Sequence, residues 1–339
     1  MIKTFREKVF YVGKSLYLCS MKKFFFLISL LCALTACSQT EGDARRCIAF
    51  WNVENYFDNH DDPGKDDQDF TPEGNYHWTA SRYLDKRNKI YKTLAALGYP
   101  AVMGLAEVEN DAVLEALCLG TPLRGKGYEA VHYESPDKRG IDCALLYRKD
   151  CFHLLESRPI VVSDTAHGFR TRDILLVVGV MGKDDTCCLL VNHWPSKAGG
   201  MKANRRRRAV ARKLRSTMDS LMRAYPNALV LAMGDFNAAP DEAVIRREMG
   251  FGRTGRNAEG VYNLMAGLPK GEGTYKYQGV WSYIDQMMAS RKLSAEVFRP
   301  EFLLTDDDRY MGHKPFRTYV GIRYHGGYSD HLPIRVCVP

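Results

Sequence analysis

The sequence predicts an α+β domain in which two β-sheets pack face to face and helices cover their outer surfaces. Short runs rich in β-branched and aromatic residues recur along the chain, separated by turn residues, as is typical of strands. A few longer segments between these runs place apolar residues on one helical face. A chain in which strands dominate and a few long helices intervene suits packed layers of sheet with helices outside.

The elements of the first half follow from these two patterns. Tyr83, Ile90 and Leu94 fall on one face of a helix, which Gly98 and Pro100 end. The expected elements are a strand over Cys47–Val53, a helix from about Ser81, a strand over Ala101–Val108, a short helix over about Asp111–Leu119, and strands over Tyr128–Tyr133, Asp142–Arg148 and Cys151–Val162.

The second half begins with a hairpin, because the turn signal Gly182-Lys183-Asp184-Asp185 separates two apolar runs. The expected elements are strands over Asp173–Met181 and Thr186–His193, a helix over about Lys202–Ala224, a strand over Ala228–Met233, a weaker helix near Asp241–Met249, and strands over Trp281–Ala289 and Leu332–Val338. Residues 290–327 give no clear pattern.

The N-terminal region has the features of an export signal. Met21–Cys37 reads MKKFFFLISLLCALTAC, with two lysines, an apolar run and then small residues, which is the order of a secretory signal. The apolar run is too short for a comfortable transmembrane helix. Leu34–Cys37 resembles the lipobox of bacterial lipoproteins, which implies cleavage before Cys37 and diacylation of its thiol. The alternative is an ordinary signal peptide with a chance cysteine.

We therefore divide the chain into a leader (residues 1–36), an anchor cysteine with a linker (37–46) and a single domain (47–339). Met21 can serve as the start, which would leave residues 1–20 outside the natural protein. The expected location is the bacterial cell envelope, where Cys37 would hold the protein on a membrane, facing the periplasm or the outside. We infer no protein partner, and we expect a monomer.

The net charge does not imply a strongly basic surface. Of the formal charge of +8, residues 1–36 carry +5 from six basic residues and one acid, so the mature part is close to +3. The run Asn204–Arg215, NRRRRAVARKLR, could face a polyanion, but it fits a solvated helix face better because Val210 and Leu214 begin an apolar stripe. The acidic run DNHDDPGKDDQD suggests calcium, but it lacks EF-hand spacing, so we interpret it as a solvated loop.

The cysteines do not indicate a disulfide framework. Of ten, three lie at or before Cys37, and the remaining seven are an odd number without paired spacing. None has the spacing of a zinc site with histidine. Four lie in apolar runs and are expected to be small buried residues: Cys143, Cys187, Cys188 and Cys337.

Several apolar runs end in a polar residue that core packing would not select. Ala228–Met233 runs directly into Gly234-Asp235-Phe236-Asn237, although burying an unpaired carboxylate is costly. The other polar residues of this kind are Asn52, Glu54, Asn55, Glu107, Asp142, Asn192, His193, Asp285, Asp330 and His331. Functional sites are built where strands meet loops.

These residue types also make chemical sense together. A carboxylate such as Glu107, with no cysteine nearby, suits Mg²⁺ or Mn²⁺. An aspartate beside a histidine forms a general-base or electrostatic pair, and asparagine can bind phosphate oxygens without adding charge. This combination fits metal-assisted cleavage of a phosphate ester.

The same residues carry a resemblance to a known family. The segments are W-N-V-E (Trp51–Glu54), L-A-E-V (Leu105–Val108), G-D-F-N (Gly234–Asn237), Y-I-D-Q (Tyr283–Gln286) and S-D-H-L-P (Ser329–Pro333). In kind and in order they resemble the endonuclease/exonuclease/phosphatase superfamily, which includes exonuclease III, pancreatic-type deoxyribonuclease and neutral sphingomyelinase. The resemblance covers about residues 47–339 and implies a four-layer α/β/β/α sandwich of two mixed sheets, with the site at one end of the sheets.

The resemblance also implies roles for these residues. His331 would be the catalytic histidine, oriented by Asp285, and Asp235 would orient or activate the attacking water. The metal would be held by Glu107, with Glu54 and Asp330 as further acids. Phosphate contacts would come from Asn52, Asn237 and the segment of Asp142 and Tyr147, and His193 would bind phosphate or protonate the leaving group, as in the deoxyribonuclease and sphingomyelinase branches.

Two departures from the family's pattern bear on the branch. Ala106 stands where many members carry glutamine, which puts fine positioning of Glu107 in doubt. Ser282–Asp285 stands where the inositol 5-phosphatase branch usually shows Trp-Cys-Asp-Arg, which argues against that branch.

The sequence thus predicts an exported, lipid-anchored phosphodiesterase that uses Mg²⁺ or Mn²⁺. DNA or RNA is the first choice of substrate, because the pair of histidines, His193 and His331, resembles the deoxyribonuclease branch. The alternatives are a phospholipid or sphingomyelin-type head group, a phosphatase, and a non-catalytic surface-binding lipoprotein on the same scaffold. The number of metal ions and the membrane leaflet stay open.

Overall fold

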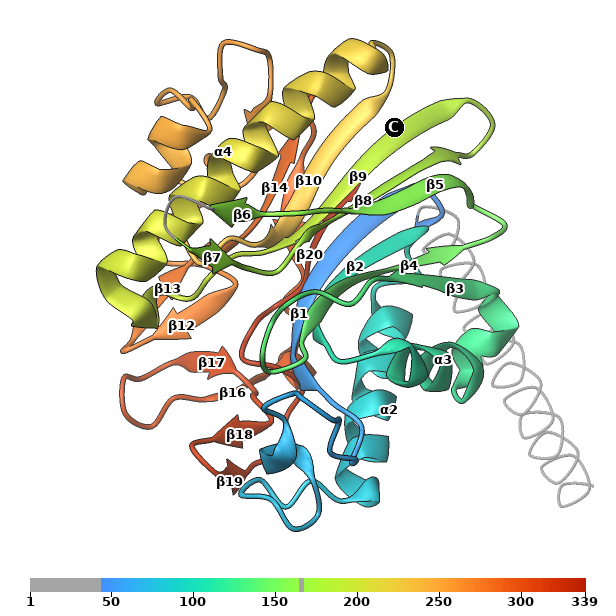
Figure 1. The fold of residues 1–339 in the computed structure, drawn as a ribbon, viewed down its shortest axis with the longest axis vertical. Helices are drawn as coiled ribbons and strands as arrows, with labels where there is room; N and C mark the ends of the chain where they lie inside the picture. The colour runs from blue at the N-terminus through green and yellow to red at the C-terminus, as the bar shows by residue number, and fades with distance from the viewer. Residues whose placement is uncertain (1–43, 165–167) are drawn as a thin grey trace, which may run out of the picture. The chain divides into compact units, whose positions relative to one another are not determined.

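The computed structural model describes residues 44–164 and 168–339, so the leader and Cys37 lie outside the described residues. Residues Arg45–Pro339 form one compact unit. Two six-stranded sheets make up its centre (Figure 1). Among the described residues, no helix combines the length and the apolar character needed to cross a bilayer.

The first sheet has the strand order β15-β20-β1-β2-β4-β3. Its strands are β1 (Cys47–Tyr56), β2 (Val102–Val108), β3 (Tyr128–His132), β4 (Asp142–Arg148), β15 (Ala295–Val297) and β20 (Ile334–Cys337). The pair β1 and β2 is parallel and the other neighbours are antiparallel. This sheet is therefore mixed.

The second sheet has the order β11-β14-β10-β9-β8-β5. Its strands are β5 (Phe152–Ile160), β8 (Ile174–Met181), β9 (Asp185–His193), β10 (Leu229–Asp235), β11 (Tyr262–Asn263) and β14 (Asp285–Ala289). Here β9 and β10 are parallel, and the other neighbours are antiparallel. The two mixed sheets confirm the predicted fold class.

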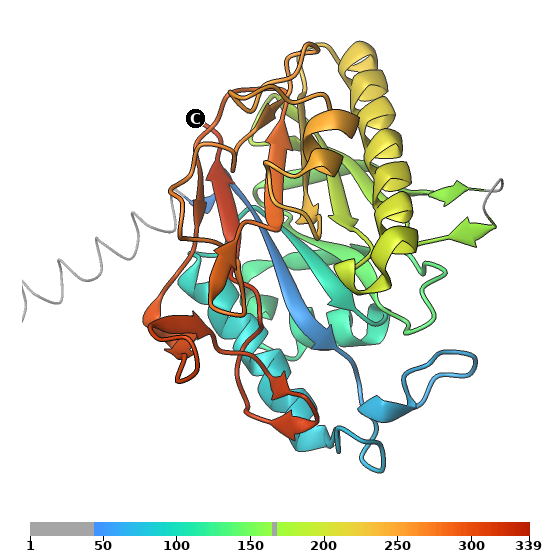
Figure 2. The same ribbon diagram turned by 90° about the vertical axis from the view of Figure 1, so that its left-hand side faces the viewer.

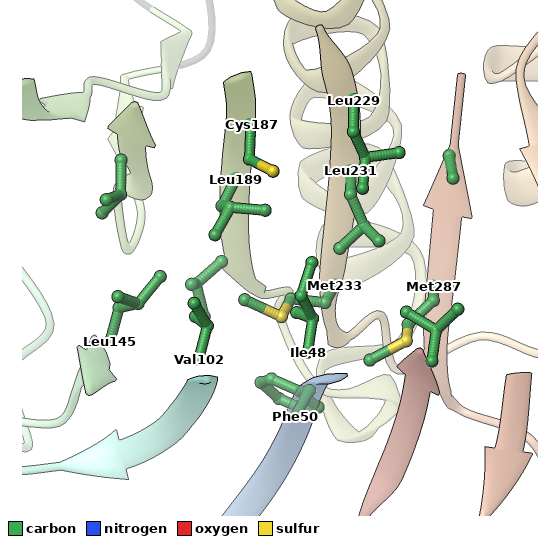
Figure 3. Close-up of a cluster of buried hydrophobic side chains, with 14 of the residues drawn as sticks. Ile48, Phe50, Val102, Leu145, Cys187, Leu189, Leu229, Leu231, Met233 and Met287 are labelled. Carbon is green, nitrogen blue, oxygen red and sulfur yellow. The ribbon is translucent and has the colours of Figure 1, made fainter. Parts of the chain in front are cut away.

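The main core lies between the two sheets. Successive side chains of a strand point to opposite faces, so Ile48 and Phe50 of β1 face the second sheet. Figure 3 shows them meeting Met233 and Leu231 of β10 across the layer. Each of these four side chains is completely buried, so the cluster joins the two sheets into one hydrophobic core.

Helices cover the outer face of each sheet (Figures 1 and 2). On the first sheet, Ala49 and Trp51 of β1 pack against α2 (Ala80–Ala96) and α3 (Asp111–Leu119). On the second, α4 (Gly200–Ala224) buries the predicted apolar stripe, which comprises Val210, Leu214, Met218 and Leu221. The layers therefore follow the order helix, sheet, sheet, helix.

Two predicted elements differ in the structure. The strand expected over Trp281–Ala289 is broken: β13 (Val280–Ser282) pairs with β12 (Tyr275–Tyr277), and β14 begins only at Asp285. The weaker helix near Asp241–Met249 is a short π-helical turn, η5 (Val244–Glu248). The unreadable stretch 290–327 contains β15 and two small hairpins, β16 (Leu304–Asp306) with β17 (His313–Pro315), and β18 (Tyr319–Val320) with β19 (Arg323–Tyr324).

The remaining short elements lie in loops. They are the pair β6 (Ser163–Asp164) and β7 (Phe169–Arg170), and the 3₁₀ turns η1 (Gln68–Phe70), η2 (Pro122–Lys126), η4 (Lys197–Gly199) and η6 (Glu301–Leu303).

Cys337 corrects the prediction made for the cysteines. It is not a buried free thiol but forms a disulfide with Cys47, at a sequence separation of 290 residues. The two are register partners on the antiparallel strands β1 and β20, which brings their side chains together. Sequence spacing could not reveal this pair, because only the pairing of the first and last strands makes them neighbours. Cys143, Cys187 and Cys188 are free and buried, as expected.

Candidate active site

The polar strand ends predicted from the sequence meet at one edge of the two sheets. On the second sheet, Asp235 at the end of β10 is the register partner of His193 at the end of β9 and of Asp285 at the start of β14. The first sheet contributes Asn52 from β1 and Glu107 from β2. His331 lies in the segment just before β20 and forms an isolated bridge with Tyr275. The strand order therefore brings residues that are distant in the sequence to one place.

His331 and Asp285 form a buried pair. Nδ1 of His331 lies 2.8 Å from Oδ2 of Asp285, and Trp51 Nε1 donates to the His331 carbonyl at 2.9 Å. Burial alone would lower the pKa of His331, but the carboxylates of Asp285, Asp330 and Asp235 outweigh it and raise the pKa well above its usual value. His331 is therefore held as a cation, with Nε2 toward Asp235 at 3.9 Å.

Asp235 lies at the centre of the group. Its Oδ2 is 3.1 Å from Nδ2 of Asn52, which donates to it, and its Oδ1 accepts from the backbone N–H of Asn237 at 2.8 Å. Burial, together with Asp285 and Glu107, raises the pKa of Asp235 to about 7 against the opposing effect of His331. A carboxylate with a pKa near neutrality can take up a proton during a reaction.

His193 faces the same carboxylate from the other side. Its Nε2 lies 3.7 Å from Oδ2 of Asp235 and 3.7 Å from Oε1 of Glu107. Burial, with the positive charges of Arg172 and Arg139, lowers the pKa of His193 well below its usual value. Its Nδ1 is buried and has no hydrogen-bond partner among the described residues. The two histidines thus have opposite charge states at neutral pH.

A bulge in β2 presents Glu107 to the site. Ala106 pairs with Cys143 and Val108 with Asp142, so Glu107 is the extra residue between them. Its backbone has a φ of 65°, and its Oε2 accepts from the backbone N–H of Asn55 at 3.0 Å. Its Oε1 accepts from Nδ2 of Asn52 at 3.3 Å. The bulge explains why one acid in an otherwise buried strand is aimed into the site.

Backbone strain is concentrated at this edge. Glu54, Asn55 and Asn237 also have left-handed backbones, with φ of 55°, 56° and 46°. Non-glycine residues rarely adopt this conformation, and clusters of them mark functional sites. Gly234 has a different constraint: a Cβ there would lie 2.2 Å from the backbone oxygen of Asn192 on the adjacent strand. The close approach of β9 and β10 explains the glycine of G-D-F-N.

Glu54 lies beside this group, and Asp330 borders it, with its Oδ1 3.8 Å from Nε2 of His331. Both bind Arg317, whose Nη2 is 2.9 Å from Oδ2 of Asp330 and whose Nε is 3.5 Å from Oε1 of Glu54. The backbone N–H of Thr318 also donates to Glu54 at 2.6 Å. Burial and the charge of Asp330 raise the pKa of Glu54 to about 7. Among the described residues, both acids therefore already have a cationic partner, Arg317.

The chemistry of the donors fits a hard divalent cation. Oxygens of Glu107 and Asp235 face the space that Asn52 and His193 also border. Mg²⁺ is typically bound by one or two carboxylates together with substrate phosphate oxygens and water. Asp235, Asp285 and His331 also approach within 4.8 Å of one another, but the 2.8 Å contact of His331 with Asp285 uses that nitrogen. Glu107, whose carboxylate borders this space and belongs to no histidine pair, is the better ligand.

Two predicted residues lie apart from the central group. Tyr147 pairs with Val102 at the far end of β4 from Asp142, and its hydroxyl donates to Glu129 at 2.6 Å. It therefore does not line the site, and this prediction is wrong, because five residues of extended strand separate it from the edge. Asp142 does lie at the edge, opposite Val108, but its Oδ1 accepts from the backbone N–H of Ser135.

Three residues at the site were not predicted. Arg172 donates to the carbonyl oxygens of His193 and Trp194, at 3.1 and 3.2 Å. Arg317 bridges Glu54 and Asp330, as described above. The ring of Tyr275 packs against the imidazole of His331 with centroids 4.9 Å apart. None of the three stands at the end of an apolar run, so the pattern that found the others could not find them.

Comparison with known proteins agrees with this geometry. Residues 47–339 match the family described as "Endonuclease/Exonuclease/phosphatase family". The chain belongs to this family. Its members are metal-dependent phosphoric ester hydrolases, and the chain is an enzyme of this type. No curated protein matches the sequence significantly.

Solved structures show the same fold at low sequence identity. The human Nocturnin catalytic domain with bound sulfate has a TM-score of 0.53 and 17% identity, over 87% of this chain and 94% of that one. D. rerio TDP2 complexed with single strand DNA product has a TM-score of 0.52 and 17% identity, over 86% and 97%. A mannosyl-6-phosphatase of Bacteroides thetaiotaomicron has a TM-score of 0.53 and 16% identity, over 86% and 98%.

Proposed function

We propose that the chain is an exported, lipid-anchored nuclease that hydrolyses phosphodiester bonds with Mg²⁺ or Mn²⁺. The main support is that Asp235 lies between two histidines of opposite charge state, with Nε2 of each within 4 Å of its Oδ2. A site that only binds phosphate has no need for a near-neutral carboxylate between a cationic and a neutral imidazole. This argument, with the family, disfavours the non-catalytic alternative.

Asp235, His331 and His193 would have different roles in the reaction. Asp235 orients a water molecule toward the phosphorus and accepts its proton, for which a pKa of about 7 is suitable. His331, held as a cation by Asp285, stabilises negative charge on the phosphoryl oxygens. His193 is neutral and serves as a hydrogen-bond partner of the phosphate.

Glu107 would hold the metal ion, and Asn52 keeps its carboxylate and that of Asp235 in place through its Nδ2. When bound, the ion supplies Lewis acidity to a phosphoryl oxygen. Asn237 is fixed beside Asp235 by its own backbone N–H and by the Trp194 carbonyl, to which its Nδ2 donates at 3.0 Å. These contacts preorganise the site before substrate arrives.

A nucleic acid is the substrate that the pair of histidines favours, and one neighbour of the same fold, D. rerio TDP2, was solved with a single strand DNA product. At the start of α4, Lys202, Arg205 and Arg206 are exposed and could contact a phosphate backbone. Binding of this kind would weaken steeply with added salt.

A small phosphate ester is the second candidate, because three of the seven basic residues of Asn204–Arg215 form ion pairs within the protein. Arg208 and Arg212 pair with Glu248, and Arg215 pairs with Glu259. These three arginines are then less available to follow a polyanion along the helix. The mannosyl-6-phosphatase neighbour is named for an ester of this size. A phospholipid or sphingomyelin-type head group is the other small ester, and a membrane anchor would bring the site close to it.

The location also belongs to this proposal. Disulfides persist in oxidising compartments, and the bond between Cys47 and Cys337 supports export of the domain. Together with the lipobox-like Leu34–Cys37, it favours a lipoprotein of the bacterial envelope, periplasmic or surface-exposed. Labelling with a radioactive fatty acid, lost in Cys37→Ala, would test the anchor.

The activity is tested with the soluble chain that starts after Cys37. The substrates are plasmid DNA, RNA, sphingomyelin, mannose 6-phosphate and bis-p-nitrophenyl phosphate, each with Mg²⁺, with Mn²⁺ and with chelator. We expect chelator-sensitive cleavage of DNA or RNA that disappears in His331→Ala. The matched control is His313→Ala, which removes an exposed histidine paired with Asp306. Faster turnover of a small ester than of nucleic acid would overturn the nuclease proposal. It would leave the assignment as a phosphoric ester hydrolase unchanged.

A further inference from the structure

A second group of carboxylates lies outside the catalytic centre. Ligand oxygens of Asp62, Asp67 and Glu109 lie within 4.8 Å of one another. Asp62 and Asp67 belong to the acidic loop (residues 57–69), and Glu109 follows β2. The acidic loop has six aspartates and a single lysine, which pairs with Glu134. Three acids so close together repel one another unless something neutralises them.

Two of these acids are buried without a partner for one oxygen. Asp67 is 1% exposed and Glu109 is 3% exposed. Among the described residues, Oδ1 of Asp67 and Oε1 of Glu109 have no hydrogen-bond partner. Their other oxygens are satisfied, by the backbone N–H of Asp62 and of Asp58 respectively. Burying an unpaired carboxylate oxygen carries a large penalty, so these two atoms point to a missing ligand.

From this arrangement we propose that Asp62, Asp67 and Glu109 bind a calcium ion. Calcium takes oxygen ligands at about 2.3–2.6 Å, so oxygens on one ion lie up to about 5 Å apart, as these do. The group contains neither histidine nor cysteine, which argues against zinc or another transition metal. Mg²⁺ is usually bound by one or two carboxylates and retains several waters, whereas three carboxylates meet here.

The ion would fasten the acidic loop to the ends of two core strands. The backbone N–H of Glu109 donates to the Tyr56 carbonyl, which ties β2 to β1 at 3.2 Å. The Glu109 carboxylate then accepts from the backbone N–H of Asp58, at the start of the loop. Asn110 donates to Asp58 and also caps α3. A cation bound to Glu109, Asp62 and Asp67 would extend this connection to the middle of the loop.

The site would therefore act on structure rather than on chemistry. The loop follows β1, which carries Asn52, and Glu109 comes two residues after Glu107. Calcium would order the chain on both sides of these strand ends. The acidic loop was expected from its sequence to be solvated, because it lacks EF-hand spacing. The structure supplies the third acid, Glu109, from the segment after β2, which no local motif contains.

Calcium binding is tested by equilibrium dialysis of the purified protein against calcium in excess Mg²⁺, with thermal unfolding in parallel. The excess Mg²⁺ is added to fill the catalytic centre. The Glu107→Gln variant, which lacks the metal ligand of that centre, tests whether calcium binds elsewhere. We expect wild type and Glu107→Gln to bind one calcium ion and to unfold about 5 °C higher than in chelator.

The Asp67→Asn and Glu109→Gln variants should not bind calcium, and calcium should not raise their unfolding temperature. In chelator they should be at least as stable as wild type, because each removes a buried unpaired charge. Asp66→Asn is the matched control, since Asp66 is an exposed neighbour in the same loop. Failure of folded wild type to bind calcium, or equal losses in Asp66→Asn and Asp67→Asn, would overturn the proposal. Neither result depends on whether the protein cleaves nucleic acid.

Discussion

Nδ1 of His331 lies 2.8 Å from Oδ2 of Asp285, and this contact fixes both the orientation and the charge of the imidazole. Asp285 opens β14 beside Asp235, so the strand pairing that builds the sheet also brings the partner of the histidine into position. The relationship makes the two residues a unit, and several measurable properties depend on it.

Asp285→Asn should lower turnover by about 10²–10⁴-fold, because the histidine loses its orienting carboxylate. The raised pKa of His331 also predicts a pH-dependent stability. The pair stabilises the folded state fully below the ordinary histidine pKa, and this contribution is lost as pH rises through the raised pKa. Urea unfolding in chelator should therefore show the largest difference between wild type and variant near pH 6, and a smaller one in alkaline buffer. Asp306→Asn, which breaks the exposed pair with His313, should change neither property.

Arg172→Lys should reduce turnover by about tenfold, although Arg172 stands outside every predicted motif. Lysine has a single nitrogen and cannot reproduce the fork by which Nε and Nη2 reach the carbonyls of His193 and Trp194 while Nη1 pairs with Asp137. We expect the loss in kcat and not in KM if Arg172 positions His193 and does not bind substrate. Arg170→Lys is the control, because Arg170 is more than half exposed and only approaches Asp173 at 3.8 Å. A change in KM alone would contradict the positioning role.

The sequence was sufficient to predict the layers and to name most of the residues that meet in the candidate site. Residues at strand ends, such as Asp235 and Asn237, interrupt an apolar run, and a carboxylate in that setting has no explanation in packing. The helix over α4 was predictable because its stripe has helical spacing and its boundaries are clear. The strand beginning at Trp281 was placed as one element because Tyr283 and Ile284 are apolar, whereas the chain breaks there between β13 and β14.

The remaining features depend on contacts between distant segments. Cys47 meets Cys337 only because β1 pairs with β20, and Glu109 meets Asp67 only because the acidic loop folds back on β2. Tyr147 was assigned to the site from its segment, without the strand direction that carries it to the far end. Arg172 and Arg317 bind carbonyls and carboxylates of the site from loops, where no periodic pattern marks a residue.

Gly234→Ala should destabilise the protein by about 1–3 kcal/mol and sharply lower turnover. The new Cβ would lie 2.2 Å from the Asn192 oxygen, so β9 and β10 would have to separate where they carry His193 and Asp235. Gly267→Ala is the control, because a Cβ there meets nothing within 4 Å. Urea unfolding and turnover measured together test the argument. Equal effects of the two substitutions would show that the close approach of the strands is unimportant.

Glu107→Gln should abolish metal-supported hydrolysis, with a loss of about 10³-fold or more, while the fold is kept. Glutamine retains one oxygen, which can still accept from the backbone N–H of Asn55, so the bulge should survive although the hydrogen bond from Asn52 is lost. Titration calorimetry with Mn²⁺ should show binding to wild type and a much weaker signal for the variant. Glu115→Gln changes an exposed glutamate of α3 and should behave as wild type in both measurements. Unchanged Mn²⁺ binding in Glu107→Gln would show that residues other than Glu107 bind the metal.

The double substitution Cys47→Ser and Cys337→Ser should lower the free energy of unfolding by about 2–5 kcal/mol. The bond joins the first and last strands of the domain across 290 residues, so its loss frees a long loop in the unfolded chain. A reducing agent should lower the stability of wild type by a similar amount and leave the double variant unchanged, because the five other described cysteines are free and buried. If reduction destabilised the variant as much as wild type, the disulfide could not be the cause. If the reduced domain were as stable as the oxidised one, the disulfide would not contribute to stability. The strongest structural support for an oxidising compartment would then be lost.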